Sequence, residues 1–137
     1  ATVDAFQHWI YEHPNHSTDE RTATWMDISK RFSSNIIDGS GLEKYSAKHW
    51  QKQLHIFEVP FYYVEYAMAQ LGAIAMWKQY KEDPKQGLAN YKAALKLGYT
   101  KTIPEIFEAG GIKFDFSEAY IKDLMSFVKS ELDQVLK

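Results

Sequence analysis

The sequence predicts an all-α fold of five or six helices around a long apolar central helix. Apolar residues recur at helical spacing along most of the chain, proline and glycine separate these stretches, and no segment shows the β-branched alternation of a strand. The length of 137 residues falls within the roughly 100–200 residues of one domain. We therefore expect residues 1–137 to form a single helical segment.

The first helix is predicted over residues 2–12, where four apolar side chains share one face: Val3, Phe6, Trp9 and Ile10. Pro14 ends this stretch, because the residue before a proline avoids the helical conformation. Ser17 and Glu20 then form a capping-box pattern, which predicts a second helix that runs to about Phe32.

The segment that follows is predicted to be irregular. Residues 33–45 contain the run Asp-Gly-Ser-Gly at 38–41, which is typical of a turn or loop. Residues 50–59 alternate weakly between polar and apolar side chains, and this favours an extended connection that ends at Pro60.

Four helices are expected in the rest of the chain, over residues 60–80, 84–97, 103–109 and from 118 onward. Proline suits the first turn of a helix, so Pro60 and Pro84 indicate two helix starts, and Gly98 indicates a helix end. Thr102 and Glu105 repeat the capping-box pattern. An apolar stripe with helical period marks the last helix.

The helix expected from residue 60 is apolar on every side. Residues 60–77 read PFYYVEYAMAQLGAIAMW, in which only Glu65 and Gln70 are plainly polar. Such a helix must be covered on all sides. Either it is the central helix of the fold, or it lies against a missing part of the chain, a partner subunit or a second copy of this chain.

The composition excludes several classes of protein. There are 16 basic and 18 acidic residues and no basic stripe, which argues against a nucleic-acid partner. The absence of cysteine excludes disulfides, thiolate metal sites and cysteine nucleophiles, and it fits a reducing compartment. No stretch is apolar enough to span a membrane, and the first residues do not resemble a signal peptide, so we expect a cytoplasmic protein.

The histidines do not form a recognisable metal site. His13 and His16 are separated by Pro14, which breaks the helical geometry that would bring two imidazoles together, so a polar helix end is the favoured interpretation. His55 differs, because apolar residues flank it and a tyrosine-rich stretch follows. It is either a buried histidine bonded to the backbone or a hydrogen-bond donor to an anionic oxygen.

Three tyrosines lie close together after His55. Tyr62 and Tyr66 are four residues apart on the expected helix, and Tyr63 and Tyr66 are three apart, so each pair shares a face. Buried tyrosines need a partner for the hydroxyl. The three tyrosines either belong to the core or line a polar cleft whose walls are otherwise apolar.

Several segments together carry a resemblance to a known family. Residues 50–73 read WQKQLHIFEVPFYYVEYAMAQLGA, residues 3–11 read VDAFQHWIY, and the segments 97–99 and 108–112 read LGY and EAGGI. These segments resemble oligoendopeptidase F, in the thimet-oligopeptidase class of zinc metallopeptidases. The resemblance extends over essentially the whole chain.

The resemblance implies a zincin-like, all-α catalytic domain with a channel that admits short peptides. In that family, zinc is held by two histidines of a His-Glu-x-x-His helix and by a later glutamate. None of these ligands is present here, so we expect them upstream of Ala1 in the same polypeptide. On this interpretation the chain is the C-terminal portion of the peptidase, and alone it binds no zinc and is inactive.

The resemblance also implies roles for residues of this chain. His55, Tyr63 and Tyr66 would contact the substrate and stabilise the oxyanion, and Tyr62 would join His55 in substrate binding. The thimet branch has a glycine-rich loop before its tyrosines, whereas residues 58–61 here read EVPF. The alternative function is a stand-alone helical binding or scaffold domain whose tyrosines bind a partner.

Overall fold

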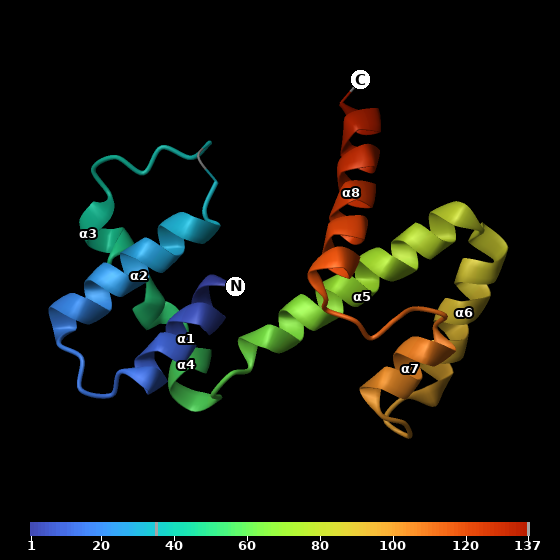
Figure 1. The fold of residues 1–137 in the computed structure, drawn as a ribbon, viewed down its shortest axis with the longest axis horizontal. Helices are drawn as coiled ribbons and strands as arrows, with labels where there is room; N and C mark the ends of the chain where they lie inside the picture. Colours follow the sequence, from blue (N-terminus) through green and yellow to red (C-terminus); the bar gives the residue numbers. More distant parts are fainter. Residues whose placement is uncertain (35, 137) are drawn as a thin grey trace. The chain divides into compact units, whose positions relative to one another are not determined.

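The computed structural model describes residues 1–34 and 36–136 as helices joined by loops (Figure 1). Within these residues there is no strand, which confirms the all-α class. The helices are α1 (Thr2–Glu12), α2 (Thr18–Phe32), α3 (Glu43–Ser46), the 3-10 helix η1 (His49–Lys52), α4 (His55–Glu58), α5 (Tyr63–Glu82), α6 (Pro84–Leu97), α7 (Ile103–Ala109) and α8 (Glu118–Val135). The six expected helices are present, and α3, α4 and η1 are additional short turns.

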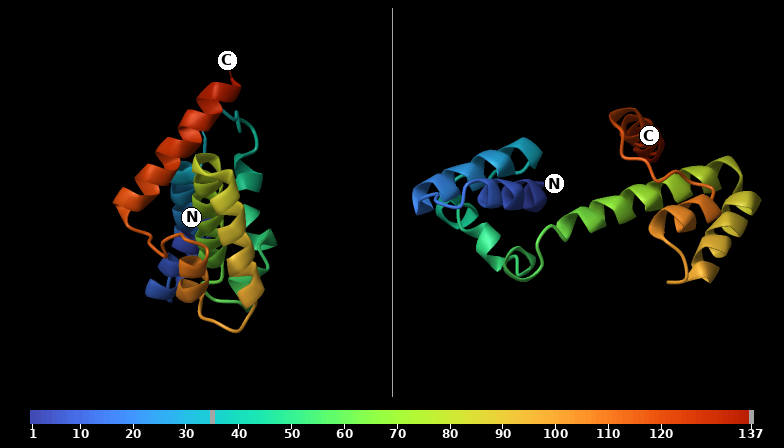
Figure 2. Two further views of the ribbon diagram at one scale, coloured as in Figure 1. Left: turned by 90° about the vertical axis from the view of Figure 1, so that its right-hand side faces the viewer. Right: turned by 60° about the horizontal axis from the view of Figure 1, so that its bottom comes forward.

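The chain divides into two compact units, Ala1–Ala67 and Met68–Lys137. In the first unit, α1 and α2 lie side by side (Figure 2). Phe6 is fully buried between two tryptophans, with ring centroids 5.0 Å from Trp25 and 5.6 Å from Trp50. This aromatic core holds the short helices of the unit against α1 and α2.

The capping box predicted for α2 is confirmed. The Glu20 backbone N–H donates to Ser17 Oγ at 3.1 Å, and the Ser17 backbone N–H donates to the Glu20 carboxylate at 2.8 Å. Both bonds satisfy backbone donors that the first turn of a helix leaves without a partner.

The extended connection predicted for residues 50–59 is wrong. This segment forms η1 and α4, with bonds such as Gln53 N–H to Trp50 O and Val59 N–H to His55 O. An extended segment needs a neighbouring strand for its backbone groups, whereas a helical turn satisfies them locally. The loop predicted for residues 33–45 is confirmed as far as Leu42, except that Asn35 lies outside the described residues.

The long helix α5 begins at Tyr63 and not at Pro60. Phe61 has a φ of 58°, which a right-handed helix cannot contain. The chain therefore turns at residues 59–62 before the helix begins, and the Tyr62 N–H donates to Val59 O across this turn. The turn places Tyr62 outside the helix and Tyr63 in its first position.

In the second unit, three helices contact α5. Gly87 of α6 lies so close to Tyr80 that an added Cβ would be 2.7 Å from the Tyr80 Cα. The ring of Phe107 in α7 lies so close to Gly72 that an added Cβ at Gly72 would be 2.9 Å from the Phe107 Cζ. From α8, Phe127 packs on Trp77 with ring centroids 4.8 Å apart. Helix α5 is thus central in this unit, but it is not covered on all sides, because Trp77 is 40% and Tyr80 47% exposed.

Capping residues set the ends of the other helices. The Asp83 carboxylate accepts the Gln86 N–H at 3.0 Å and starts α6, and Gly98 ends it with a φ of 51°. A capping box between Thr102 and Glu105 starts α7. Among the described residues, no helix is both long enough and apolar enough to cross a membrane.

Candidate active site

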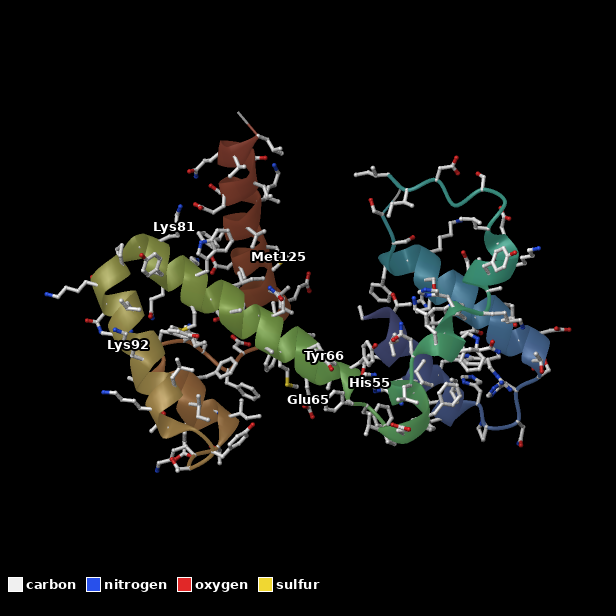
Figure 3. All side chains as sticks on the ribbon, turned by 180° about the vertical axis from the view of Figure 1, so that it is seen from behind. His55, Glu65, Tyr66, Lys81, Lys92 and Met125 are labelled. Atoms are coloured by element: carbon white, nitrogen blue, oxygen red, sulfur yellow. The ribbon has the colours of Figure 1, made fainter. Side chains whose placement is uncertain are left out.

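The four site residues predicted from the sequence come together where α4 is joined to α5. Figure 3 shows His55 and Tyr66 near each other at the start of α5. The ring centroid of His55 lies 5.4 Å from that of Tyr62, 5.2 Å from Tyr63 and 6.2 Å from Tyr66. The four rings form one aromatic cluster, which is named the His55 cluster below.

His55 is the first residue of α4 and is half-buried. Its ring is nearly parallel to that of Tyr62, at 18°, and meets Tyr63 and Tyr66 edge-on. Within residues 1–34 and 36–136, neither ring nitrogen of His55 has a hydrogen-bond partner. Of the two interpretations open from the sequence, the backbone-bonded core histidine is therefore not what the structure shows.

The three tyrosine hydroxyls differ in their surroundings. Tyr63 is half-buried, and its hydroxyl donates to Gln53 Oε1 at 2.6 Å. Tyr66 is 54% exposed and Tyr62 is 37% exposed. A hydrogen bond with Tyr66 raises the pKa of Tyr62 above its ordinary value, and the charges of Tyr66 and Glu65 act in the same direction. The raised pKa favours the neutral phenol of Tyr62.

The turn between His55 and Tyr62 is held by a residue that the sequence analysis did not select. Gln7 is buried, with Nε2 donating to Ile56 O at 3.4 Å and Oε1 accepting the Phe61 N–H at 3.1 Å. Position 7 is four residues after Val3, so it shares the apolar face of α1. A polar residue on the buried face of an amphipathic helix was the signal that could have identified it.

The described residues do not fit a zinc site. Among them, no group of three or more histidine, aspartate or glutamate side chains is placed to hold a metal ion. Nδ1 of His13 is 2.9 Å from Trp9 O, and Nδ1 of His16 is 2.5 Å from His13 O. Arg21 Nε donates to the other ring nitrogen of His16 at 2.8 Å. These two imidazoles form a polar helix end, as predicted.

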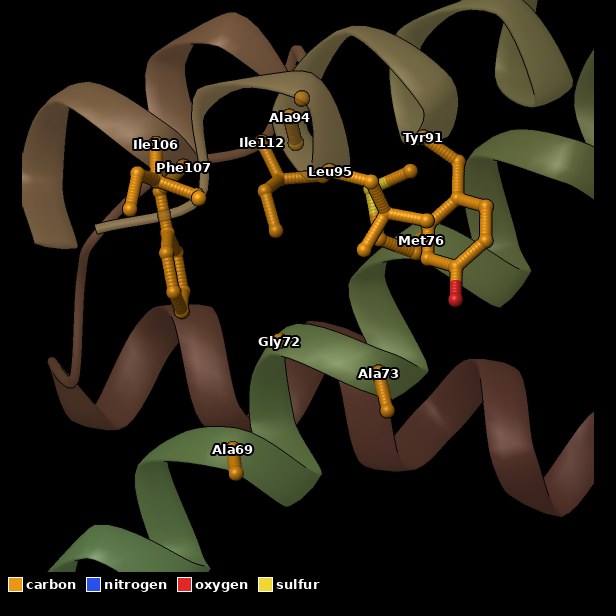
Figure 4. A pocket seen from close by; sticks show the side chains of 12 residues that line it. Ala69, Gly72, Ala73, Met76, Tyr91, Ala94, Leu95, Ile106, Phe107 and Ile112 are labelled. Atoms are coloured by element: carbon orange, nitrogen blue, oxygen red, sulfur yellow. The ribbon is translucent and has the colours of Figure 1, made fainter. Parts of the chain in front are cut away.

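An apolar hollow of about 480 Å³ lies in the second unit, between α5, α6 and α7 (Figure 4). Small side chains of α5, such as Ala69 and Ala73, face Leu95 of α6 and Phe107 of α7. Tyr91 is the one ionisable side chain among its lining residues. Because acid–base and nucleophilic chemistry need such groups, the candidate for chemistry is the His55 cluster.

Comparison with known proteins decides the family. Residues 1–126 match peptidase family M3. The chain belongs to this family. A solved structure of PZ peptidase A with an inhibitor is similar to this M3 chain, with a TM-score of 0.85 and 28% sequence identity over 97% of the chain. An X-ray structure provisionally named an oligoendopeptidase F has a TM-score of 0.80 and 30% identity over 96% of the chain.

The family predicted from residues 50–73 and the shorter segments is thus confirmed. The M3 chain spans 24% of the length of PZ peptidase A and 23% of the second structure. No curated protein matches the sequence.

Proposed function

We propose that this chain forms one wall of the active-site cleft in a zinc-dependent M3 peptidase that cleaves short peptides. The proposal extends to the branch, oligoendopeptidase F, and to the position, the C-terminal portion of the catalytic domain. One observation carries it: in a chain of a peptidase family, an imidazole and three phenols from separate turns converge within 6.2 Å between ring centroids.

Zinc and the residues that bind it would be supplied by polypeptide outside this chain, since the described residues offer no site for it. When bound, zinc supplies a Lewis acid and an activated water in peptidases. The partners of this chain are then the rest of the peptidase and an oligopeptide substrate.

The His55 cluster would act on the carbonyl oxygen of the scissile peptide. Negative charge grows on this oxygen as the carbonyl is attacked, and a donor aimed at it stabilises the transition state more than the ground state. Tyr66 is 54% exposed, and the ring nitrogens of His55 have no partner among the described residues. Both can donate to that oxygen without first breaking a bond to a carbonyl or carboxylate.

The other two tyrosines would have different roles. Tyr62 stacks on His55 and is partly exposed, which suits contact with the substrate chain. Tyr63 is proposed as a further donor, and this role requires its hydroxyl to leave Gln53. The family match favours this peptidase function over a scaffold domain whose tyrosines grip a partner.

The test uses the protein that the complete gene encodes. His55→Ala and Tyr66→Phe are expected to lower turnover of a short peptide by about 10²–10³, the usual loss for one oxyanion donor. Zinc content should stay at the wild-type value. Tyr80→Phe, on the exposed part of the same helix, is the matched control. Wild-type turnover in both site variants would remove the His55 cluster from the active site.

A further inference from the structure

We propose that Gln7 is a positioning residue for the His55 cluster, which it orients by fixing both ends of the turn between His55 and Tyr62. The inference rests on the proposed function, since it concerns the same site. It adds a buried residue of α1 that does not belong to the cluster.

The two hydrogen bonds of Gln7 fall next to site residues. Its amide nitrogen donates to the carbonyl of Ile56, which follows His55 directly. Its amide oxygen accepts the N–H of Phe61, which precedes Tyr62. The side chain is 1% exposed, so water cannot replace either bond. One amide thus connects the two backbone segments that carry the imidazole and the first phenol.

Phe61 is the position in this turn where a fixed contact is needed most. With a φ of 58°, it is the one described residue other than glycine in the left-handed region. A residue with a Cβ stays in this region only where its surroundings impose it. Helix α1 supplies these surroundings, because the Phe61 ring lies 4.6 Å from that of His8 and 5.2 Å from that of Tyr11, between centroids.

The loss of Gln7 would allow Phe61 to leave the left-handed conformation, and this change would alter the His55 cluster. Without its amide oxygen, the Phe61 N–H has no buried acceptor to hold it in the left-handed conformation. A return of Phe61 to negative φ rotates the following peptide, and with it the direction in which Tyr62 and Tyr63 leave the turn. The stacking of Tyr62 on His55 would then be lost.

The chemistry of the position requires a primary amide of this length. Only glutamine combines an N–H donor for Ile56 O with a carbonyl acceptor for the Phe61 N–H at this reach. Methionine keeps the length and volume and loses both bonds. An ionised glutamate keeps the acceptor and loses the donor.

The experiment compares Gln7→Met with Val3→Ala in the protein of the complete gene. Val3 lies on the same helix and in the same buried cluster, so its truncation loosens the core without touching the turn. Hydrogen exchange of the Phe61 amide and peptide turnover are measured in both variants. In Gln7→Met we expect the Phe61 amide to exchange about tenfold faster and kcat to fall about tenfold. KM and zinc content should be nearly unchanged. Val3→Ala should change the exchange of Phe61 no more than that of other core amides.

Each result decides a separate question. Unchanged exchange at Phe61 in Gln7→Met overturns the inference. Faster exchange with wild-type kcat also overturns it, provided that Tyr66→Phe lowers kcat in the same assay. If Tyr66→Phe and His55→Ala are both fully active, the proposed function fails, whatever the exchange shows. Should Gln7→Met not fold, Gln7→Asn replaces it, because its amide is one methylene too short to reach both backbone groups. Faster exchange of the Phe61 amide and lower kcat are then expected, and wild-type values in both overturn the inference.

Discussion

The Tyr63 hydroxyl donates a hydrogen bond to Gln53 Oε1 at 2.6 Å, whereas Tyr66, one helical turn further along α5, is 54% exposed. The two phenols lie side by side, with ring centroids 5.5 Å apart. The two phenols therefore have similar positions, but the Tyr63 hydroxyl already has an acceptor in Gln53. A group whose proton is committed to a neighbouring amide must give up that bond before it can donate to a substrate.

This difference predicts an order of effects for two matched variants. Tyr66→Phe should lower turnover by about 10²–10³, as expected for a free oxyanion donor. Tyr63→Phe should lower it less, and it should reduce the free energy of unfolding by about 0.5–1.5 kcal/mol through loss of the bond to Gln53. Peptide turnover and urea unfolding of both variants provide the comparison. Equal losses of turnover would show that Tyr63 leaves Gln53 readily.

The ionisation of Tyr62 offers a second prediction. A hydrogen bond with Tyr66 raises the pKa of Tyr62, so its phenolate should form at higher pH than in a free tyrosine. Because the raised pKa favours the neutral phenol in the folded state, the stabilisation is complete below the ordinary value near 10 and is lost as pH rises through the folded value. The absorbance of the phenolate, taken as the difference between wild type and Tyr62→Phe, isolates this group among the nine tyrosines. In a Tyr66→Phe background the same titration should move to lower pH, and an unchanged midpoint would contradict the assignment of its cause.

The sequence predicted the elements whose signals are local. The helices that start at a capping box or at Asp83 appear at the predicted residues, because these signals act through hydrogen bonds within one turn. The start of α5 was missed because it depends on Phe61, whose positive φ is imposed by contacts with α1 more than fifty residues away in sequence. A proline pattern carries no information about such contacts.

In the site, too, local spacing could be predicted and tertiary contacts could not. The helical spacing of Tyr63 and Tyr66 placed these two phenols near each other, and the structure brings His55 to them. Tyr62 lies near Tyr66 as predicted, although it precedes the helix. Two glutamines were not predicted, since their bonds depend on tertiary contacts: Gln53, which accepts the Tyr63 hydroxyl, and Gln7, which bonds the backbone of the turn before Tyr62. The family resemblance supplied the chemistry, which spacing alone left undecided.

A third prediction concerns metal in the isolated chain. After dialysis, the 137-residue chain should retain no stoichiometric zinc and should cleave no peptide, because the described residues offer no group of three ligands. Elemental analysis of the dialysed protein, with a peptide assay on the same sample, is the measurement. One tightly bound zinc per chain would contradict it, and His13→Ala with His16→Ala would then show whether the two imidazoles hold the ion.

The last prediction concerns the packing of α6 on α5, which shapes the second unit. An added Cβ at Gly87 would lie 2.7 Å from the Tyr80 Cα and 2.9 Å from its nitrogen, and backbone atoms cannot move aside as the end of a side chain can. Gly87→Ala gains about 1 kcal/mol of helix propensity, but the overlap must separate the two helices at a cost of about 1–3 kcal/mol or more. We expect a net loss of stability, seen as a lower urea midpoint. Gly39→Ala is the control, because an added Cβ there has nothing within 4 Å and the glycine φ is not in the left-handed region. A Gly87→Ala protein as stable as this control would show that α6 does not approach α5 as closely as the structure has it.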